Sequence, residues 1–271
     1  MNVNFIKTSP AQNMTILVKD SLSRSDHWKV AQQLMRYESV YAEQVGFIEP
    51  ASDPAACLRL QMMGGEFCGN ATMSLAAVAA RDGGLKAGET TKVMLEVSGA
   101  ENILECDVTA EEGAFTCKVE MPAPKGIEKI SFNAAGKSVE TDIVRLPGIS
   151  HVIVNDVLHS AQKTFAEDAV ADLIGKIEDE AFGIMLFDEK KQFMVPVVYV
   201  KDIGAMTWEH GCASGSAAVC AYFANRAGKD TELEVRQPGG TITATAKSPG
   251  TKMRLWVKTS VRIVAEGVAY I

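Results

Sequence analysis

The sequence predicts an α+β protein made of two similar domains in which strands outnumber helices. The 271-residue chain carries an internal repeat whose offset is about half its length. Alternating apolar and polar residues, which are typical of half-buried strands, form the commonest pattern in both halves. One clear helix in each half follows a cysteine, at equivalent positions of the repeat. These observations favour a duplicated domain over one larger fold.

Four short blocks define the repeat, and they occur in the same order in both halves. The strongest pair is Cys68–Thr72 and Cys212–Ser216, because each block opens a run of small residues and the cysteines lie 144 positions apart (212 minus 68). The other pairs are Leu95–Val97 with Leu233–Val235, Val18–Asp20 with Val154–Asp156, and Phe47–Glu49 with Phe187–Glu189. A period this long indicates two similar domains rather than a solenoid.

Strands are predicted where the alternation is clearest. These segments are Cys57–Met62, Phe115–Met121 and Met253–Val257. Glu112-Gly113 supplies a turn before the second of them, and Gln237–Gly240 forms another predicted turn. The segment Pro122–Gly126 has the composition of a linker between the two halves.

Helices are predicted directly after the two cysteines of the repeat. The first, after Cys68, places apolar residues of Met73–Ala80 on one face and should end at Gly83. The second, after Cys212, should end at Gly228. Two further helices are predicted over Trp28–Met35 and Asp168–Ile177.

Composition excludes several classes of function. Lysine and arginine total 27 against 34 aspartate and glutamate, which gives a net charge of −7 and disfavours nucleic acid as a partner. No apolar run approaches the roughly 20 residues of a membrane span, so no membrane contact is expected. The segment Met1–Gln12 lacks the pattern of a signal peptide, and the expectation is a cytoplasmic protein.

The six cysteines do not fit a metal site or a disulfide framework. None forms a C-x-x-C pair and histidine is scarce, so no metal is expected. Four of the thiols are best explained as small core residues, namely Cys57, Cys106, Cys117 and Cys220.

Cys68 and Cys212 differ from the others because both stand at a predicted helix start. The first turn of a helix has unpaired backbone N–H groups and the positive end of the helix dipole. A thiol there is expected to be more acidic than a free cysteine, and the same N–H groups can hold a carboxylate. Each half therefore offers a reactive thiol beside an anion site.

Two such units suit racemisation at a carbon next to a carboxylate. One cysteine, as thiolate, takes the Cα proton, and the other, as thiol, returns a proton to the opposite face. Donors at the helix starts stabilise the negative charge that develops on the carboxylate. This chemistry requires no metal and no cofactor, and no glycine-rich phosphate loop is present.

The two cysteine motifs identify a family resemblance. Glu66–Thr72 and Trp208–Gly215 resemble the motifs of the diaminopimelate epimerase family of cofactor-independent racemases, and the similarity extends along nearly the whole chain. Within that family the chain particularly resembles the histidine racemases of staphylopine-type metallophore biosynthesis. The supporting stretches are Gln12–Val18, Glu43–Glu49, Met185–Glu189, Gln237–Gly240 and Ala269–Ile271.

The resemblance implies a fold of two pseudo-symmetric domains, each a mostly antiparallel sheet or barrel around a central helix. The expected halves are residues 1–124, with a C-terminal strand at 259–271 returning to them, and residues 125–258. The active site is expected in the cleft between the halves. A homodimer is also implied, with a small-molecule amino acid as substrate and D-histidine as product.

The resemblance also implies a role for individual residues. Cys68 and Cys212 match the two catalytic bases. The residues that match substrate-binding positions are Asn13, Gln44, Gly69, Asn70, Glu209, Ala213 and Ser214. His151 matches a supporting histidine, and a His151–Glu209 pair would help to set which thiol is ionised or would bind the α-amino group.

Three departures from the family pattern bear on the substrate. Diaminopimelate epimerases have asparagines where this chain has Ile149 and Ile184, and an arginine where it has His210. These changes would leave the distal carboxylate of diaminopimelate unpaired at a cost of several kcal/mol. A smaller, partly apolar pocket remains, which suits an imidazole.

The alternatives are a diaminopimelate epimerase, a racemase of another amino acid, and a phenazine-biosynthesis-type isomerase, which lacks the cysteine pair. A two-domain clamp that binds an amino acid without chemistry would need the helix starts but no thiols. A thiol-redox protein is disfavoured by the absence of C-x-x-C, although a reversible Cys68–Cys212 disulfide is conceivable.

Overall fold

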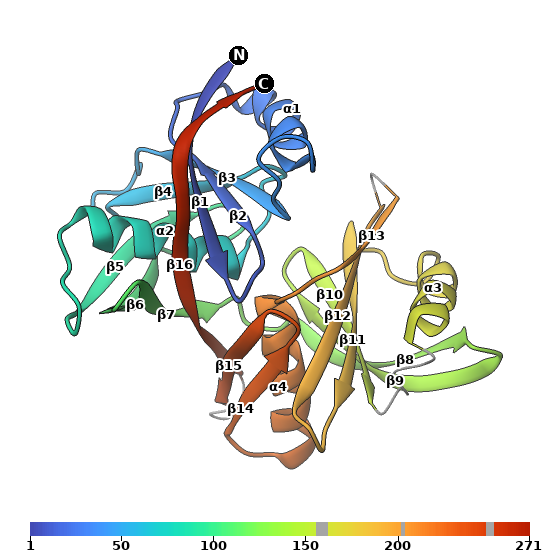
Figure 1. The fold of residues 1–271 in the computed structure, drawn as a ribbon. Coiled ribbons are helices and arrows are strands. Elements are labelled where there is room, and N and C mark those ends of the chain that lie inside the picture. Colours follow the sequence, from blue (N-terminus) through green and yellow to red (C-terminus); the bar gives the residue numbers. More distant parts are fainter. Residues whose placement is uncertain (156–161, 202–203, 248–251) are drawn as a thin grey trace. The chain divides into compact units, whose positions relative to one another are not determined.

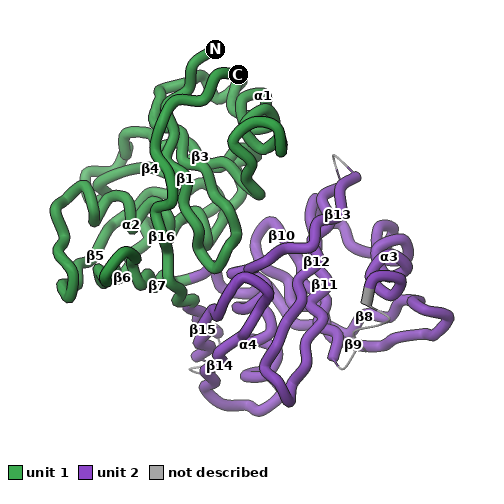
Figure 2. The backbone as a smooth tube through the Cα atoms, in the orientation of Figure 1, with its two compact units in different colours: residues 1–120, 257–271 green, residues 121–256 purple. Residues whose placement is uncertain are grey.

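A computed structural model describes residues 1–155, 162–201, 204–247 and 252–271. The chain divides into two compact units, one formed by Met1–Glu120 with Val257–Ile271 and the other by Met121–Trp256 (Figure 2). The described residues form sixteen strands and four helices, so the fold is a strand-dominated α+β arrangement, as predicted.

Unit 1 is built from the N-terminal elements and the last strand of the chain (Figure 1). Its elements are β1 (Asn2–Pro10), β2 (Thr15–Val18), α1 (Arg24–Met35), β3 (Gln44–Glu49), β4 (Leu58–Met62), α2 (Gly69–Asp82), β5 (Thr90–Val97), β6 (Leu104–Glu111), β7 (Ala114–Met121) and most of β16 (Arg254–Tyr270).

The strands of unit 1 form a closed ring. They pair in the order β1-β2-β3-β4-β5-β6-β7-β16, and β16 pairs back with β1 in antiparallel register. Helix α2 contacts each strand from β1 to β6 and is buried along most of its length. Its small residues explain this, because an alanine-rich helix fits where larger side chains would force the strands apart.

Unit 2 contains the remaining elements. These are β8 (Gly126–Ala134), β9 (Lys137–Leu146), β10 (Ile149–Asn155), α3 (Gln162–Leu173), β11 (Ala181–Asp188), β12 (Phe193–Val200), β13 (Ala205–Trp208), α4 (Ala213–Ala227), β14 (Thr231–Gln237) and β15 (Gly240–Lys247). Its strands pair in the order β15-β14-β12-β11-β10-β9-β8, with β13 on β12. Helix α4 contacts five of them and is buried on most of its surface.

Strand pairing repeats in the same sequence in the two units. From β1 to β6 the successive pairs are antiparallel, parallel, antiparallel, parallel and antiparallel. The series β9, β10, β11, β12, β14 and β15 pairs in the same way. The repeat block Leu95–Val97 ends β5, and its copy Leu233–Val235 lies in β14, its equivalent strand. Asp156, in another repeat block, lies outside the described residues.

The two helices after the cysteines are confirmed, and both end where glycine was predicted to stop them. Helix α2 ends before Gly83, and α4 ends before Gly228, which adopts the left-handed conformation (φ 63°). The predicted linker Pro122–Gly126 is short, because β8 already begins at Gly126.

The other two helices begin earlier than their apolar patterns predicted. Helix α1 starts at Arg24, a turn before Trp28, because Ser23 occupies the N-cap position and the first turn is mostly exposed and polar. Helix α3 starts at Gln162 and ends at Leu173, so it stops before Gly175. Polar first turns carry no apolar periodicity, and the sequence pattern therefore placed both starts too late.

Candidate functional site

Cys68 stands at the N-cap of α2. Its backbone is extended (φ −134°, ψ 111°), and its Sγ accepts a hydrogen bond from the Ala71 backbone N–H at 3.5 Å. The Cys68 carbonyl accepts hydrogen bonds from the backbone N–H and the hydroxyl of Thr72. The thiol therefore takes the place that a serine or aspartate side chain usually fills at a helix start.

Polar groups of β2, of β3 and of the segments that precede these strands surround this thiol. The Cys68 S–H donates to Oε1 of Gln44 at 2.8 Å. The Gln44 amide Nε2 donates to Oδ1 of Asn13 and to Oγ1 of Thr15, and Asn13 in turn donates to Glu43. The fold thus brings together three of the residues predicted from sequence, Cys68, Gln44 and Asn13. Thr15 and Glu43 complete the network, which we call the first half-site.

Cys212 occupies the same position at the N-cap of α4. Its backbone is extended (φ −121°, ψ 109°), and its Sγ accepts from the Gly215 backbone N–H at 3.4 Å. Its Sγ also lies 3.5 Å from the Ser214 hydroxyl. Ser216 donates to the Cys212 carbonyl through both its backbone N–H and its hydroxyl, as Thr72 does in unit 1. We call Cys212, Ser214, Gly215 and Ser216 the second half-site.

The first turns of α2 and α4 differ in how deeply their residues are buried. Gly69, Asn70 and Ala213 are buried, whereas Ser214 is half-buried. These residues form the first turns of α2 and α4, where backbone N–H groups lack partners within the helix. They are the positions predicted to hold a carboxylate.

His151 lies behind the second half-site as a neutral base. It is fully buried on β10, and its Nε2 lies 2.9 Å from the Ser214 hydroxyl. Burial lowers the pKa of His151 to about 3, against a smaller opposing effect of Asp179. Its Nδ1 has no hydrogen-bond partner among the described residues. His151 therefore orients Ser214, which lies next to the Cys212 thiol. Its imidazole is uncharged near neutral pH.

Burial raises the pKa of the Cys212 thiol well above its ordinary value. The charge of Glu209 and a hydrogen bond to that residue add to the increase. Hydrogen bonds from Ser214 and the Gly215 N–H act in the opposite direction and are outweighed. The expectation of an acidified thiol at this helix start was therefore wrong for Cys212, because desolvation and a neighbouring carboxylate exceed the effect of the helix terminus.

Burial of neutral His151 predicts a dependence of stability on pH. Below about pH 6.5 the unfolded chain binds a proton at His151, whereas the folded chain does so only near pH 3, so stability falls as the pH decreases through this window. The loss is up to about 1.4 kcal/mol per pH unit. Urea unfolding of wild type and His151→Gln at pH 7 and pH 5 measures it, and wild type should lose about 2 kcal/mol more.

His27, whose pKa is also lowered by burial, titrates in both proteins and cancels from this comparison. Equal losses of unfolding free energy in wild type and His151→Gln would contradict a neutral buried imidazole at position 151.

Two glycines allow the second half-site to pack closely. A Cβ at Gly215 would lie less than 3.0 Å from Sδ of Met185 and 3.2 Å from Sγ of Cys212. A Cβ at Gly183 would lie less than 3.0 Å from Nδ1 of His151 and from Cε of Met185. Met185 on β11 therefore fills the space that both glycines leave, and a Cβ at either position would require a neighbouring side chain to shift.

Ile184 lies in the core of unit 2 rather than on an open surface. It is fully buried on β11 and belongs to an apolar cluster with Phe182 and Val197. Its replacement of a family asparagine therefore removes a polar group from the interior of the unit. Ile184 is one of the three departures predicted to disfavour diaminopimelate, and it lies on the face of β11 opposite to Gly183 and Met185, because side chains alternate along a strand.

Sequence reasoning missed several residues of the half-sites. Thr15, Met185 and Gln237 occur in stretches that supported the resemblance, yet no role was assigned to them. Ser98 gave no signal of its own, since a lone serine is common. The repeat offered one clue, because Ser98 follows the Leu95–Val97 block directly.

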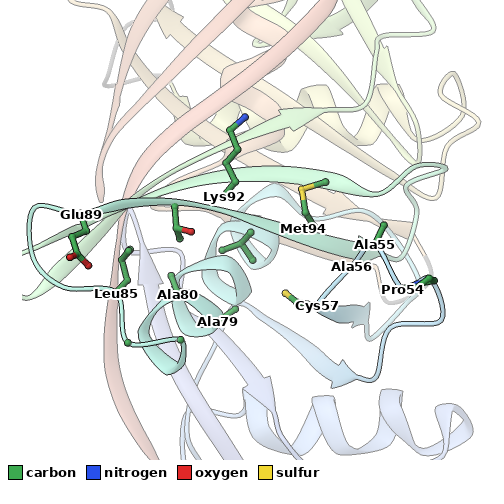
Figure 3. Close-up of a pocket in the computed structure, with 14 residues that line it drawn as sticks. Pro54, Ala55, Ala56, Cys57, Ala79, Ala80, Leu85, Glu89, Lys92 and Met94 are labelled. Carbon is green, nitrogen blue, oxygen red and sulfur yellow. The ribbon is translucent and has the colours of Figure 1, made fainter.

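A separate cavity of about 510 Å³ lies at the other end of α2. It is lined by residues at the C-terminal end of that helix, including Ala80, by the β5 residues Lys92 and Met94, and by Cys57 (Figure 3). A 14-residue helix is about 20 Å long, so this cavity is remote from Cys68. It contains none of the predicted site residues.

In the described part of the chain, no group of three or more histidine, cysteine, aspartate or glutamate side chains is arranged to hold a metal ion. None of the helices described is long and apolar enough to cross a membrane.

Comparison with known proteins identifies the family. Residues 2–270 match the family described as histidine racemase CntK N-terminal domain. The chain belongs to the histidine racemase family. The particular resemblance to histidine racemases, predicted from stretches such as Gln12–Val18 and Glu43–Glu49, is thereby confirmed.

Relatives that match over nearly their whole length are also called histidine racemases. A histidine racemase of Fusobacterium nucleatum subsp. nucleatum is 34% identical over 275 residues, which covers 99% of this chain and 97% of the relative. A histidine racemase of Staphylococcus aureus is 32% identical, covering 99% of this chain and 98% of the relative.

Solved structures share the fold at low sequence identity. A probable proline racemase from Agrobacterium radiobacter K84 has a TM-score of 0.73 at 10% identity, covering 99% of this chain and 92% of that one. A hydroxyproline epimerase from Agrobacterium vitis has a TM-score of 0.69 at 10% identity, covering 98% of this chain and 92% of that one. The fold of this family member is therefore that of racemases and epimerases.

Proposed function

We propose that this chain interconverts L-histidine and D-histidine, with Cys68 and Cys212 acting on opposite faces of the substrate Cα and no cofactor taking part. One observation carries the proposal: in a member of the histidine racemase family, each unit caps its equivalent helix with a cysteine thiol. Packing alone does not explain a matched pair of thiols at two helix starts.

The proposed reaction has two proton transfers. In the first, one thiolate takes the Cα proton, so a Cα–H bond breaks and an S–H bond forms while the electron pair remains on the substrate as a carbanion. In the second, the other thiol gives its proton to the opposite face of Cα, so an S–H bond breaks and a new Cα–H bond forms. The enzyme ends with the protonation states of its two thiols exchanged. After the product leaves, one thiol loses its proton to solvent and the other thiolate takes one up, which restores the enzyme for the next turnover in the same direction.

The carbanion needs stabilisation because its charge spreads onto the α-carboxylate. The proposed donors are the backbone N–H groups of the first turns, at Gly69 and Asn70 in α2 and at Ala213 and Ser214 in α4. They stabilise the transition state more than the ground state, since negative charge on the carboxylate increases as the proton leaves.

Glu209 has a second proposed role as the partner of the substrate α-ammonium. In the free enzyme the Glu209 charge helps to keep the Cys212 thiol protonated. An ammonium group bound to Glu209 would neutralise that charge and so lower the pKa of Cys212 toward the range where it acts as a base. Asn13 and Gln44 are proposed to bind polar groups of the substrate beside Cys68, to which Gln44 is hydrogen-bonded.

Several finer parts of the proposal rest on resemblance. The first is the diaminopimelate-epimerase-like fold of two pseudo-symmetric domains, one at residues 1–124 with 259–271 and the other at 125–258. The others are the role in opine-type metallophore biosynthesis, the cytoplasmic location and the homodimer. The repeated order of strand pairing supports the pseudo-symmetry.

The preference for histidine over diaminopimelate rests on Ile149 and His210, which replace polar family residues, and on family membership. A diaminopimelate epimerase, a racemase of another amino acid, and a binding clamp without chemistry are the other outcomes that the test must distinguish.

The test is proton NMR in deuterated water with a reductant present and no cofactor added. L-histidine, meso-diaminopimelate and a panel of other amino acids are followed separately for loss of the Cα–H signal. We expect rapid exchange with histidine, D-histidine as product, and no change in rate when pyridoxal phosphate is added. Dialysis against a chelator should also leave the rate unchanged.

Each other outcome has a defined meaning. Exchange with another amino acid would keep the two-thiol chemistry and discard histidine as substrate. No exchange with any amino acid by folded, reduced protein would favour the clamp. A protein that is inactive until pyridoxal phosphate is supplied would refute the cofactor-independent mechanism.

A further inference from the structure

The strand that follows each capped helix ends against the helix-capping cysteine or the residues directly before it. Strand β5 ends with the repeat block Leu95–Val97, and β14 contains its copy, Leu233–Val235. At the offset of this block (138, or 233 minus 95), Gly99 is equivalent to Gln237. The same place in the duplicated topology therefore serves both half-sites, although different residue types occupy it.

In unit 1, Ser98 and Gly99 hold the segment that leads to Cys68. Ser98 is 4% exposed, and its hydroxyl accepts from the Met62 backbone N–H at 2.9 Å and donates to the Glu66 carbonyl at 2.8 Å. Gly99 adopts φ +72°, and a Cβ there would lie less than 3.0 Å from the backbone N of Phe67. The end of β5 thus lies directly against the two residues before the thiol.

In unit 2, Gln237 binds the backbone of Cys212 itself. It is 5% exposed, and its Oε1 accepts from the Cys212 backbone N–H at 2.7 Å. Its Nε2 donates to the Ser216 hydroxyl at 2.8 Å, and that hydroxyl donates to the Cys212 carbonyl at 2.7 Å. One amide side chain therefore links both sides of the Cys212 residue.

We propose that Ser98 with Gly99 in unit 1, and Gln237 in unit 2, are positioning residues that fix the direction of the Cys68 and Cys212 thiols respectively. An N-cap residue has non-helical backbone angles and lies at a helix end that readily frays, so its side-chain direction depends on what holds its backbone. The effect on catalysis rests on the proposed function. The effect on the thiols themselves does not.

The first test measures the thiols without substrate. Alkylation by iodoacetamide is followed at each cysteine by mass spectrometry from pH 6 to pH 10, in wild type, Ser98→Ala and Gln237→Met. We expect Gln237→Met to raise the alkylation rate of Cys212 several-fold and leave that of Cys68 unchanged, because the buried N-cap of α4 becomes looser. Ser98→Ala should do the reverse. Each protein thus contains its own reference thiol.

Gln32→Met, an exposed glutamine substitution on α1, is the control for loss of an amide. Equal alkylation rates in wild type and both positioning variants would overturn the proposal, and so would equal increases at both cysteines within one variant. If Gln237→Met does not fold, Gln237→Asn keeps the amide oxygen and nitrogen on a shorter side chain. This variant must still change the alkylation rate of Cys212 selectively. Ser98→Thr, which keeps the hydroxyl, should restore the wild-type rate at Cys68.

The second test adds the reaction. Because the enantiomers are equally stable, kcat/KM must fall equally in both directions, by about 10- to 100-fold for a displaced thiol. The asymmetry appears instead in the isotope effects on kcat/KM, measured with Cα-deuterated L- and D-histidine. Slowing one thiol makes its proton transfer more rate-limiting, so Ser98→Ala and Gln237→Met should shift the ratio of the two isotope effects in opposite directions.

A lower kcat/KM with an unchanged ratio of isotope effects would indicate general damage to the fold and would contradict the positioning roles. A wild type that racemises nothing would count against the proposed function, while the alkylation result would still decide whether these residues hold the thiols.

Discussion

Cys212→Ser and Cys68→Ser are each expected to lower the rate of racemisation by about 100- to 10,000-fold, the range that a positioned acid or base contributes. A serine hydroxyl loses its proton far less readily than a thiol, so it cannot act as the base for one enantiomer. Both substitutions should leave the fold intact, because the change is nearly isosteric and serine is a favoured N-cap residue.

Two signals must be read separately in this experiment. Chirality of the product reports racemisation, whereas loss of the Cα–H signal in deuterated water reports proton removal by either thiol. Cys220→Ser is the matched control, since Cys220 is buried in the middle of α4, the helix that Cys212 caps, and burial raises its pKa to about 12. It should retain full activity. Near-wild-type racemisation by either N-cap variant would end the two-base mechanism.

Gly215→Ala is expected to lower kcat/KM by about 100-fold or more. The added methyl group would overlap the end of the buried Met185 side chain and press on Sγ of Cys212, so the Met185 side chain must shift and the thiol must give way. Displacement of a reacting group by about 1 Å is sufficient for an effect of this size. The same overlap should lower the free energy of unfolding by about 1–3 kcal/mol, as expected when a packed interior receives an extra methyl group.

Gly175→Ala provides the control for this substitution. Gly175 also lies in unit 2, has no left-handed backbone, and has no atom within 4 Å of an added Cβ. We expect its activity and its urea unfolding curve to match those of wild type. If Gly215→Ala retained full activity, the close packing of Met185, Gly215 and Cys212 would not be required for catalysis. Gly215→Ala combined with Met185→Ala should regain part of the lost stability, since truncating Met185 removes the principal overlap.

The contrast between the half-sites shows how far local sequence predicts chemistry. Both cysteines occupy N-caps, and this much follows from the small residues and apolar periodicity after them. The helix terminus favours a thiolate at Cys212, but burial and Glu209 oppose it more strongly. Local position therefore predicted where the thiol lies, and its surroundings determined which protonation state is favoured.

The sequence by itself determined the strand-dominated α+β class, the helices that follow Cys68 and Cys212, and membership of a racemase family. The class and the helices follow from periodicity and from glycines that stop helices, which depend on neighbours a few residues apart. The family follows from the resemblance of the two cysteine motifs and of further stretches along nearly the whole chain. The starts of α1 and α3 were placed too late, because polar first turns have no periodicity.

Only the tertiary structure decided which distant side chains meet. The hydrogen bonds of Gln44 to Cys68, of His151 to Ser214 and of Gln237 to Cys212 join residues 24, 63 and 25 positions apart. The space that Gly183 and Gly215 leave for Met185 depends on how strands pack against α4, and the burial of Ile184 depends on how they pack against α3. Packing and desolvation arise from all neighbouring elements at once, and no local pattern in the chain encodes them.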